Sequence, residues 1–413
     1  MKKQFGYLIA ILLALVSLMQ ISIVHAQSEM KRMVVWHAYR GEEKTAFEKV
    51  VKNYNEKIAG KGLYFKPLAV PYDAYADKIS AAIPRGKGPD VFIYAQDRLG
   101  GWIEAGNTLE SIDFYAEDKE LERFPGSLIS AMTYNDTLYG LPFNFKMPAM
   151  IYNKKLVNSA PKTTDELIKV AKALTDEKMG RFGLAYEYSN FFFHSAILNA
   201  FGGKAFEKGG LVSEMVSKEN LNSIEFMLKW FQQDKVLPAE PSSSLITSLF
   251  NDGKAAIVFS GPWMLGEISQ DIEYAIAPMP VISELGKPMA PWMSVEGLYI
   301  SKSSKNKEQS YDFIKYLTSQ KVALVMGQEG RQLPSNIKVW DEKVMQENPV
   351  AMAFKEQMKT AVTMPNYAQM TLMWSPATTA MNKIVKGTAS PKAALLEAQN
   401  SISKDILALA KSH

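Results

Sequence analysis

Cysteine is absent from the 413 residues of this chain. Its absence excludes disulfide bonds, thiolate metal sites, a cysteine nucleophile and a lipid-modified cysteine. Histidine is scarce as well, because only His25, His37, His194 and His413 are present, and no two of them have metal-ligand spacing. We therefore expect neither a metal site nor a cofactor.

Common catalytic motifs are also missing. The sequence has no Gly-x-Ser-x-Gly nucleophile elbow and no Walker-type phosphate loop. A glycosidase needs two opposed carboxylates. Asp77, Asp97, Glu187 and Glu296 are candidates for such a pair, but no motif singles one out. We expect a protein that is not an enzyme, and a secreted glycan hydrolase or lyase stays open as the alternative.

Neither sign of charge is in large excess. The chain has 47 Lys and Arg against 43 Asp and Glu, and without Lys2 and Lys3 the basic count is 45. A nucleic-acid-binding protein would show a dense basic stripe. The composition therefore argues against a nucleic-acid partner.

Only one long hydrophobic run is present, from Phe5 to Val24, with two lysines before it and small or apolar residues up to Ala26 after it. This pattern predicts a signal peptide at residues 1–26, cleaved after Ala26, and a protein in the periplasm. An uncleaved anchor is the alternative, because the run approaches the length that spans a bilayer. We expect the remainder to be soluble.

Strand-like and helix-like segments alternate in the first third of a chain that is too long for one core. An amphipathic helix is predicted from Phe47, Val50, Val51 and Tyr54 at helical spacing. Strands are predicted at 33–37, 63–70 and 90–95, and a second helix at 73–83. This order is typical of an α/β fold with mostly parallel sheets that helices cover on both faces.

The pattern changes after residue 140. Two short strands interrupted near Pro148 suit a segment that passes from one domain to the next. Thr163 or Thr164 is expected to cap a following helix. The later segments predict a strand within 254–263, a strand pair at 274–278 and 297–301, and helices to the end.

An acid and a base, Asp97 and Arg98, directly follow the predicted strand 90–95. In open α/β sheets ligands sit at the carboxyl ends of strands. This pair therefore either binds a hydroxyl-rich ligand through its polar atoms or pairs with protein charges to fix the loop. Gly100 and Gly101 come next and allow close backbone approach at a helix start.

Aromatic residues occupy similar positions. Tyr94 precedes the acid–base pair, Trp263 follows the strand within 254–263, and Trp374 lies on or beside a late helix. Aromatic rings with hydrogen-bonding neighbours suit the apolar faces and polar rim of a sugar ring. Packing in a core or a domain interface is the alternative for each of them.

Four segments together resemble, in order and spacing, the periplasmic maltose-binding family and its oligosaccharide-binding relatives. The segments are GKGPDVFIYAQDRLGGWIEAG, YGLPFNFKMPAMIYNKKLV, FNDGKAAIVFSGPW and MPNYAQMTLMWSPATTAMNKIVKG. The resemblance runs from Met33 to about Ile406. It implies a monomeric, two-lobed binding protein that holds a sugar in an interlobe cleft and delivers it to the permease subunits of an ABC importer.

The resemblance also implies domain boundaries and site residues. The N-terminal lobe would comprise 27–144 and 297–340, the C-terminal lobe 149–291 and 341–413, and the hinge would lie near 145–148 and 292–296. The matching positions are Asp97 and Arg98 for sugar hydroxyls, Trp263 and Trp374 for stacking, Tyr94 in place of a stacking tryptophan, and Asp77 near an acid that reaches a glucosyl unit.

Other positions depart from the family pattern. Lys146 replaces a cleft glutamate, Thr378 replaces an arginine, and Arg40 lies in the segment YRGEEK where an Asp-Lys pair is expected. Phe192 or Tyr188 would substitute for a missing stacking tyrosine, and Arg331 lies in a loop that approaches the cleft or caps a helix.

These departures leave the cargo open. Lys146 either recognises a carboxylate on an acidic oligosaccharide or pairs with a neighbouring protein acid while the ligand is neutral. Arg40 and Arg331 are the other support for an acidic sugar, polyol or glycerophosphodiester. We expect a neutral oligosaccharide of the maltodextrin type.

Overall fold

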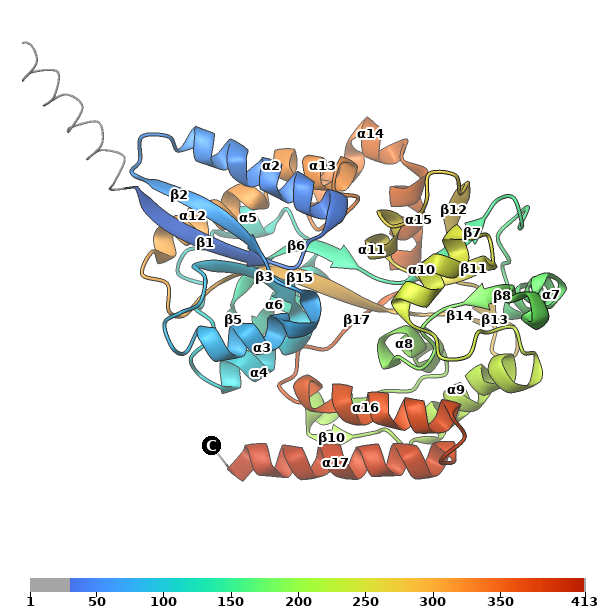
Figure 1. Ribbon diagram of the computed structural model, residues 1–413. Helices are drawn as coiled ribbons and strands as arrows, with labels where there is room; N and C mark the ends of the chain where they lie inside the picture. The colour runs from blue at the N-terminus through green and yellow to red at the C-terminus, as the bar shows by residue number, and fades with distance from the viewer. Residues whose placement is uncertain (1–29, 412–413) are drawn as a thin grey trace, which may run out of the picture.

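The computed structural model describes residues 30–411 and shows two lobes side by side (Figure 1). The predicted signal peptide at 1–26 lies outside the described residues. Within 30–411, every helix is too short or too polar to cross a membrane. Two sheets, one in each lobe, organise the molecule.

The sheet of the first lobe contains strands from widely separated parts of the chain. Its members are β1 (Lys31–His37), β2 (Leu63–Ala69), β3 (Val91–Ala95), β6 (Gly140–Lys146), β15 (Trp292–Ile300), β16 (Leu333–Pro334) and β17 (Val362–Thr363). The order is β16-β6-β15-β3-β1-β2, and β17 pairs with β15. β1 runs parallel to β2 and β3, whereas β15 runs antiparallel to β3 and β6.

The sheet of the second lobe is smaller. It consists of β7 (Ala149–Asn153), β8 (Phe182–Ala185), β11 (Ala255–Ser260) and β12 (Tyr274–Ala277), in the order β12-β7-β11-β8. β11 is parallel to β8, and β7 is antiparallel to both of its neighbours.

Two expectations about the sheets are wrong in detail. Both sheets are mixed rather than mostly parallel, and the strands expected as a pair near 274 and 297 belong to different sheets. The physical reason is the route of the chain. A parallel neighbour requires a crossover of a dozen or more residues, but β6 continues into β7 of the other lobe after two residues. A strand that enters the sheet from the other lobe does not follow such a crossover, so it can run antiparallel to its neighbours.

Helices surround both sheets. Those of the first lobe are α2 (Gly41–Lys57), α3 (Tyr72–Ala82), α4 (Leu99–Glu104), α5 (Asp118–Leu121), α6 (Gly126–Met132), α12 (Lys307–Leu317) and α13 (Gln320–Gln328). The others are α7 (Thr164–Leu174), α8 (Phe191–Ala200), α9 (Lys218–Leu228), α10 (Ser243–Asn251), α11 (Pro262–Leu265), α14 (Lys343–Gln346), α15 (Pro349–Met358), α16 (Met370–Val385) and α17 (Pro391–Lys411).

Local sequence explains where two of these helices form. The side chains predicted to share one face of α2, from Phe47 to Tyr54, are buried. Thr163 caps α7, because its hydroxyl oxygen accepts a hydrogen bond from the backbone N–H of Glu166 at 3.2 Å. The amphipathic pattern and the capping signal were therefore sufficient for these elements.

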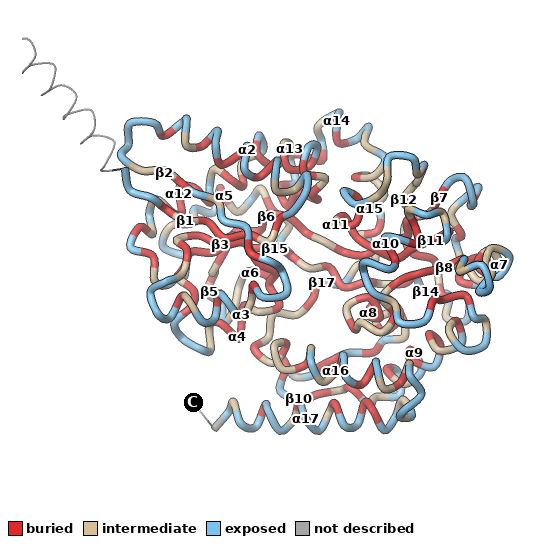
Figure 2. The backbone as a smooth tube through the Cα atoms, in the orientation of Figure 1, coloured by how far each residue is buried: buried red, intermediate tan, exposed pale blue. Residues whose placement is uncertain are grey.

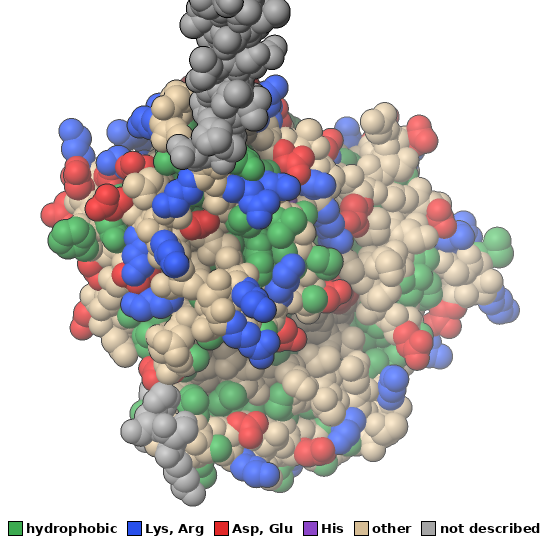
Figure 3. All heavy atoms as spheres, turned by 60° about the vertical axis from the view of Figure 1, so that its left-hand side comes forward, with side chains coloured by type: hydrophobic (Ala, Val, Ile, Leu, Met, Phe, Trp, Pro, Cys, Tyr) green, Lys and Arg blue, Asp and Glu red, His purple; other side chains and the backbone are tan. Residues whose placement is uncertain are grey.

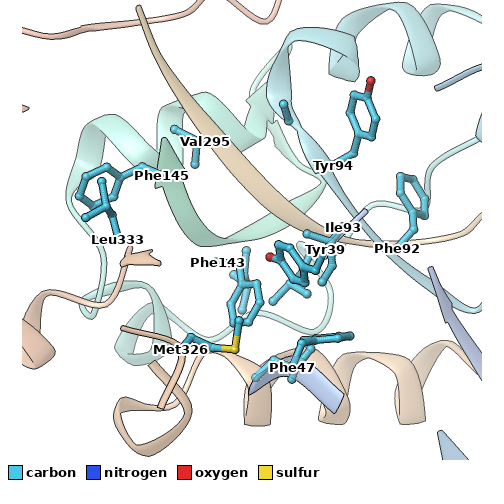
Figure 4. Packing of buried hydrophobic residues seen from close by; sticks show 14 of the residues in the cluster. Tyr39, Phe47, Phe92, Ile93, Tyr94, Phe143, Phe145, Val295, Met326 and Leu333 are labelled. Atoms are coloured by element: carbon cyan, nitrogen blue, oxygen red, sulfur yellow. The ribbon is translucent and has the colours of Figure 1, made fainter. Parts of the chain in front are cut away.

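Buried residues follow the strands and the helix faces turned toward them (Figure 2). In the first lobe, Phe47 of α2 and Met326 of α13 lie next to Phe143 of β6 and Tyr39 (Figure 4). The ring centroids of Phe47 and Phe143 are 6.3 Å apart, in an edge-to-face arrangement. This packing positions the first turns of α2, where Glu42 and Glu43 lie.

The Gly-Gly pair brings α4 against the segment that precedes α16. The backbone N–H of Gly100 donates to the carbonyl of Asn366 at 3.0 Å. A Cβ at Gly100 would lie 2.5 Å from both Ala368 N and Asn366 O. The predicted close backbone approach is confirmed, and it joins the first lobe to the chain that leads into α16.

We predict that Gly100→Ala destabilises the protein by about 1–3 kcal/mol, because the new methyl group overlaps backbone atoms that cannot rotate away. The free energy of unfolding in urea measures the effect. Gly126→Ala is the matched control, since a Cβ at this helical glycine meets no atom within 4 Å. Equal stability of the two variants would contradict the close approach.

Candidate functional site

Asp97 lies in a short 3₁₀ turn (Gln96–Arg98) directly after β3, and its side chain is buried, with 6% of the residue exposed. The indole N–H of Trp374, on α16, donates to Asp97 Oδ2 at 3.1 Å. Arg98 Nε lies 3.5 Å from the same oxygen. Asp97 therefore interacts with two protein side chains, its neighbour Arg98 and the distant Trp374 on α16.

Burial raises the pKa of Asp97 to about 6, although the Arg98 charge and the Trp374 hydrogen bond oppose this shift. A carboxylate with so little water around it is a strong acceptor for any donor that reaches it. The hydroxyl groups of a sugar are donors of this kind. The electrostatics of Asp97 therefore suit a ligand that donates hydrogen bonds.

Tyr94 does not present the exposed ring that its position suggested. It is buried, with 6% exposed, and packs edge-to-face against Tyr75 and Trp102. Tyr72, at the start of α3, lies parallel to Tyr94 with a centroid separation of 5.9 Å, and 61% of Tyr72 is exposed. The accessible aromatic face beside Asp97 thus belongs to Tyr72, which the sequence reasoning missed.

Aromatic side chains of the second lobe form another group. Trp263 is the second residue of α11, and its half-buried ring lies 6.2 Å from that of Phe192 on α8. Gly261 makes this position possible, because a Cβ there would lie 2.1 Å from a carbon of the Trp263 ring. Trp374 packs perpendicular to the buried ring of Trp292 at 6.1 Å. Trp263 and Trp374 are each only partly buried, so part of their surface is accessible.

Lys146 ends β6 in a cluster of polar groups. Its ammonium lies 3.1 Å from Glu296 Oε1 and 3.4 Å from Glu43 Oε1, and 16% of its side chain is exposed. Burial by itself lowers the pKa of Lys146, but the two carboxylates outweigh it and hold the pKa above its usual value. The cluster therefore contains a charged lysine between two acids.

Neutral groups complete this cluster. The hydroxyl of Tyr39 donates to Glu296 Oε2 at 2.9 Å and accepts from the Asn144 amide at 3.1 Å. The Gln332 amide donates to Glu43 Oε1. These contacts hold the two acids in place. The charge of Lys146 is already paired with them, so it is not free to bind an acidic ligand.

The two arginines pair with acids as well. Arg40 lies 3.4 Å from Glu267, and Arg331 lies 2.7 Å from Glu42. Arg331 Nη1 also donates to the carbonyl of Leu265 at 2.8 Å. Because Glu267 and Leu265 adjoin α11 while both arginines belong to the first lobe, these contacts join the lobes.

Asp77, Tyr188 and Thr378 form no hydrogen bond or ion pair with Asp97. Asp77 is exposed on α3 and forms no ion pair with a described residue. Tyr188 is buried, and its hydroxyl donates to the carbonyl of Pro238 at 2.8 Å, so it packs within the second lobe. Thr378 is exposed on α16, one turn beyond Trp374.

The structure thus brings Asp97, Arg98 and Trp374 together and adds Tyr72 beside them. Trp263 and Phe192 form a second aromatic group on the other lobe, and a hollow in the surface lies between the lobes (Figure 3). Within residues 30–411 no group of three His, Asp or Glu side chains is arranged to hold a metal ion. The arrangement can bind a polar ligand with apolar faces.

Comparisons with known proteins agree with this architecture. The sequence profile described as "Bacterial extracellular solute-binding protein" matches residues 38–324. The chain therefore belongs to the family of bacterial extracellular solute-binding proteins.

Individual relatives bind sugars. A maltotriose-binding protein from Pyrococcus abyssi is 30% identical over 378 residues, which cover 89% of this chain and 80% of the relative. A galactooligosaccharide-binding protein from Bacillus subtilis is 26% identical and the match covers 91% and 90% of the two chains. The solved structure of a Thermus thermophilus maltotriose-binding protein with maltotriose superimposes with a TM-score of 0.83 at 24% identity, covering 91% and 100%, and confirms the two-lobed fold.

We predict that Asp97→Asn stabilises the protein only at neutral pH. The folded-state pKa of about 6 exceeds the ordinary 3.8, so the buried charge lowers stability as pH rises through 4 to 6. The variant should gain about 1–3 kcal/mol at pH 7.5 and nothing near pH 4. Chemical denaturation at both pH values measures this difference. An equal difference at the two values would show that the carboxylate is well solvated.

Proposed function

We propose that this protein is the periplasmic solute-binding subunit of an ABC importer and that its cargo is a neutral oligosaccharide of the maltodextrin type. The observation that carries the proposal is the group formed by Asp97, Trp374 and Tyr72. It combines a desolvated carboxylate with an indole and an accessible phenol ring. This is the chemistry that a sugar ring with apolar faces and donor hydroxyls requires.

The charges support a neutral rather than an acidic cargo. Lys146, Arg40 and Arg331 were the reasons to consider an acidic ligand, and each lies within 3.4 Å of a glutamate oxygen. A ligand carboxylate would have to displace a protein carboxylate that is already in place. A neutral sugar makes no such demand, and Glu43 and Glu296 offer acceptors to its hydroxyls.

The proposal includes the residue roles and the hinge. Asp97 and Arg98 bind hydroxyl groups, and Trp263, Trp374, Tyr72 and Phe192 stack on sugar rings. The lobes turn about the segments near 145–148 and 292–296, and closure removes water from the polar contacts. The protein acts as a monomer after removal of residues 1–26, presents the closed form to the permease and catalyses no reaction. Its relatives are binding proteins, which supports the last point.

A second cargo, a galactooligosaccharide, is favoured by the Bacillus relative. Both cargoes are neutral and both use ring stacking, so the charge pattern does not distinguish them. The two sugars differ in the geometry of the linkage between their rings, and the stacking residues Tyr72 and Trp263 would select one geometry. Direct competition between maltotriose and galactotriose decides which fits.

The function is tested by calorimetric titration of residues 27–413 with maltotriose, a galactotriose and a triuronic acid. We expect heat of binding with maltotriose, weaker binding of galactotriose and none with the acid. Tyr72→Ala should weaken maltotriose binding by about tenfold, since stacking of this size contributes about 0.5–1.5 kcal/mol beyond burial. Phe114→Ala is the control, because Phe114 is 92% exposed and its ring contacts that of Tyr115 rather than a residue of the site. Binding of the acid alone would overturn the proposal.

We also predict that Arg331→Ala weakens maltotriose binding about three- to tenfold through a faster dissociation rate. Arg331 makes one hydrogen bond across the lobes, which stabilises the closed form by about 1 kcal/mol, whereas its exposed ion pair with Glu42 stays within the first lobe. Stopped-flow fluorescence measures both rate constants. Lys49→Ala removes an ion pair with Glu329 that stays within the first lobe, and it should leave both rates unchanged.

A further inference from the structure

The first lobe carries a group of exposed basic side chains at its β2 edge. We call this group the basic face; its members are Lys31, Arg32, Lys61, Lys66, Arg85 and Lys87. None of the six forms an ion pair with a described residue, whereas many other lysines and arginines of the chain do. The sugar-binding site uses none of them.

Sheet pairing and loop contacts bring these residues together. β1 and β2 are parallel and pair Val34 with Lys66 and Arg32 with Tyr64. The backbone N–H of Lys31 donates to the carbonyl of Gly62 at 2.8 Å, which places Lys61 beside it. The loop of Arg85 and Lys87 is held to the same strand, because the Asp90 carboxylate accepts from the N–H of Val34 at 2.9 Å.

The charge of this region differs from that of the remaining chain. Residues 30–90 contain twelve Lys and Arg against seven Asp and Glu, although the two signs nearly balance over the whole sequence. On this side of the molecule, basic side chains gather around a small hydrophobic area (Figure 3). Leu68 of β2 is 41% exposed in the same strand as Lys66. Basic residues around an exposed apolar side chain suit a membrane surface with anionic head groups.

The position of the basic face along the chain points in the same direction. Lys31 follows Val24, the last residue of the hydrophobic run, by seven residues. Seven residues span at most about 25 Å when extended. Whenever the run occupies a bilayer, as a signal before cleavage or as a retained anchor, the start of β1 therefore lies close to the head groups.

We propose that the basic face docks the protein reversibly on anionic phospholipid at the membrane surface. This inference rests on the proposed function, because a binding protein that delivers its cargo to a permease gains from staying close to the membrane. The attraction acts over about a Debye length, so it weakens as salt rises. Protection of the β2 edge against strand pairing accounts for Lys66 and Pro67, but it leaves Lys31, Lys61, Arg85 and Lys87 without a role.

Co-sedimentation with vesicles tests the proposal. Residues 27–413 contain every described helix and strand, so this chain is mixed with vesicles of phosphatidylcholine alone or with about one third phosphatidylglycerol. We expect binding to the anionic vesicles at 50 mM NaCl, little binding at 300 mM, and none to the neutral vesicles. Equal sedimentation with both vesicle types, or with neither, would overturn the proposal.

Charge reversal locates the binding surface. The variant Lys61→Glu, Arg85→Glu, Lys87→Glu changes only turn residues and should lower the apparent affinity for anionic vesicles at least tenfold. The control Lys386→Glu, Lys392→Glu, Lys404→Glu changes net charge equally, at exposed positions near the C-terminus that form no ion pair with a described residue, and should bind as the unmodified chain. Equal losses in both variants would show that net charge alone drives association and would overturn the proposed face.

Two further readouts separate the possible failures. The melting temperature and maltotriose affinity of both variants should equal those of the unmodified chain, because neither set touches the sugar site. If the first variant melts early, Arg32→Gln, Lys66→Gln replaces it. Vesicle binding without sugar binding would refute the proposed function and leave the basic face intact, and sugar binding without vesicle binding would do the reverse. If the protein bound heparin but did not bind anionic vesicles, the basic face would be assigned to an acidic polymer instead, and the proposal would be overturned.

Discussion

The hydrogen bond from Trp374 to Asp97 is the contact on which the arrangement of the site depends. It joins the end of β3 in the first lobe to α16, and its 3.1 Å length holds an indole ring beside a buried carboxylate. The contact also has a cost, because burial raises the pKa of Asp97 to about 6. Buried groups whose pKa is shifted in this way are common at functional sites. Of the two interpretations of the acid–base pair, the structure shows the contact with protein groups, and sugar binding by Asp97 belongs to the proposed function.

The cations around the cleft follow a different principle. Lys146, Arg40 and Arg331 are each balanced by glutamates, so the cleft contains charge but little excess of it. Paired charges in a partly buried place hold their neighbours in fixed positions more than they add affinity. Lys146 in particular pairs with both Glu43 and Glu296, at 3.4 and 3.1 Å. The substitution that first suggested an acidic cargo instead supports neutral hydrogen-bond recognition.

Local signals in the sequence predicted much of the fold and part of the site. The strand before Asp97, the helix face from Phe47 to Tyr54 and the Thr163 cap depend on neighbours a few residues away, and the structure shows all three.

Contacts between distant segments were not predictable in this way. The partners of Lys146 come from positions more than 100 residues away on either side, and no periodicity connects them. Tyr94 was misplaced because the packing of α3 on β3 covers its ring with Tyr72. The direction of β15 was missed because it is set by the return from the other lobe rather than by a local crossover.

Two kinds of contact join the lobes, apolar packing and polar contacts. The larger hydrophobic cluster is continuous between the lobes, since it contains the first-lobe sheet and also Ile151 of β7, Phe250 of α10 and Val258 of β11. A single large side chain in such a core contributes several kcal/mol. Polar contacts between the lobes include the Trp374–Asp97 hydrogen bond, the Arg331–Leu265 hydrogen bond and the exposed Arg40–Glu267 pair. Hydrogen bonds and exposed pairs of this kind stabilise by about 1 kcal/mol each. In the proposed function, a ligand that touches both lobes adds contacts of this size and so shifts the population between open and closed forms.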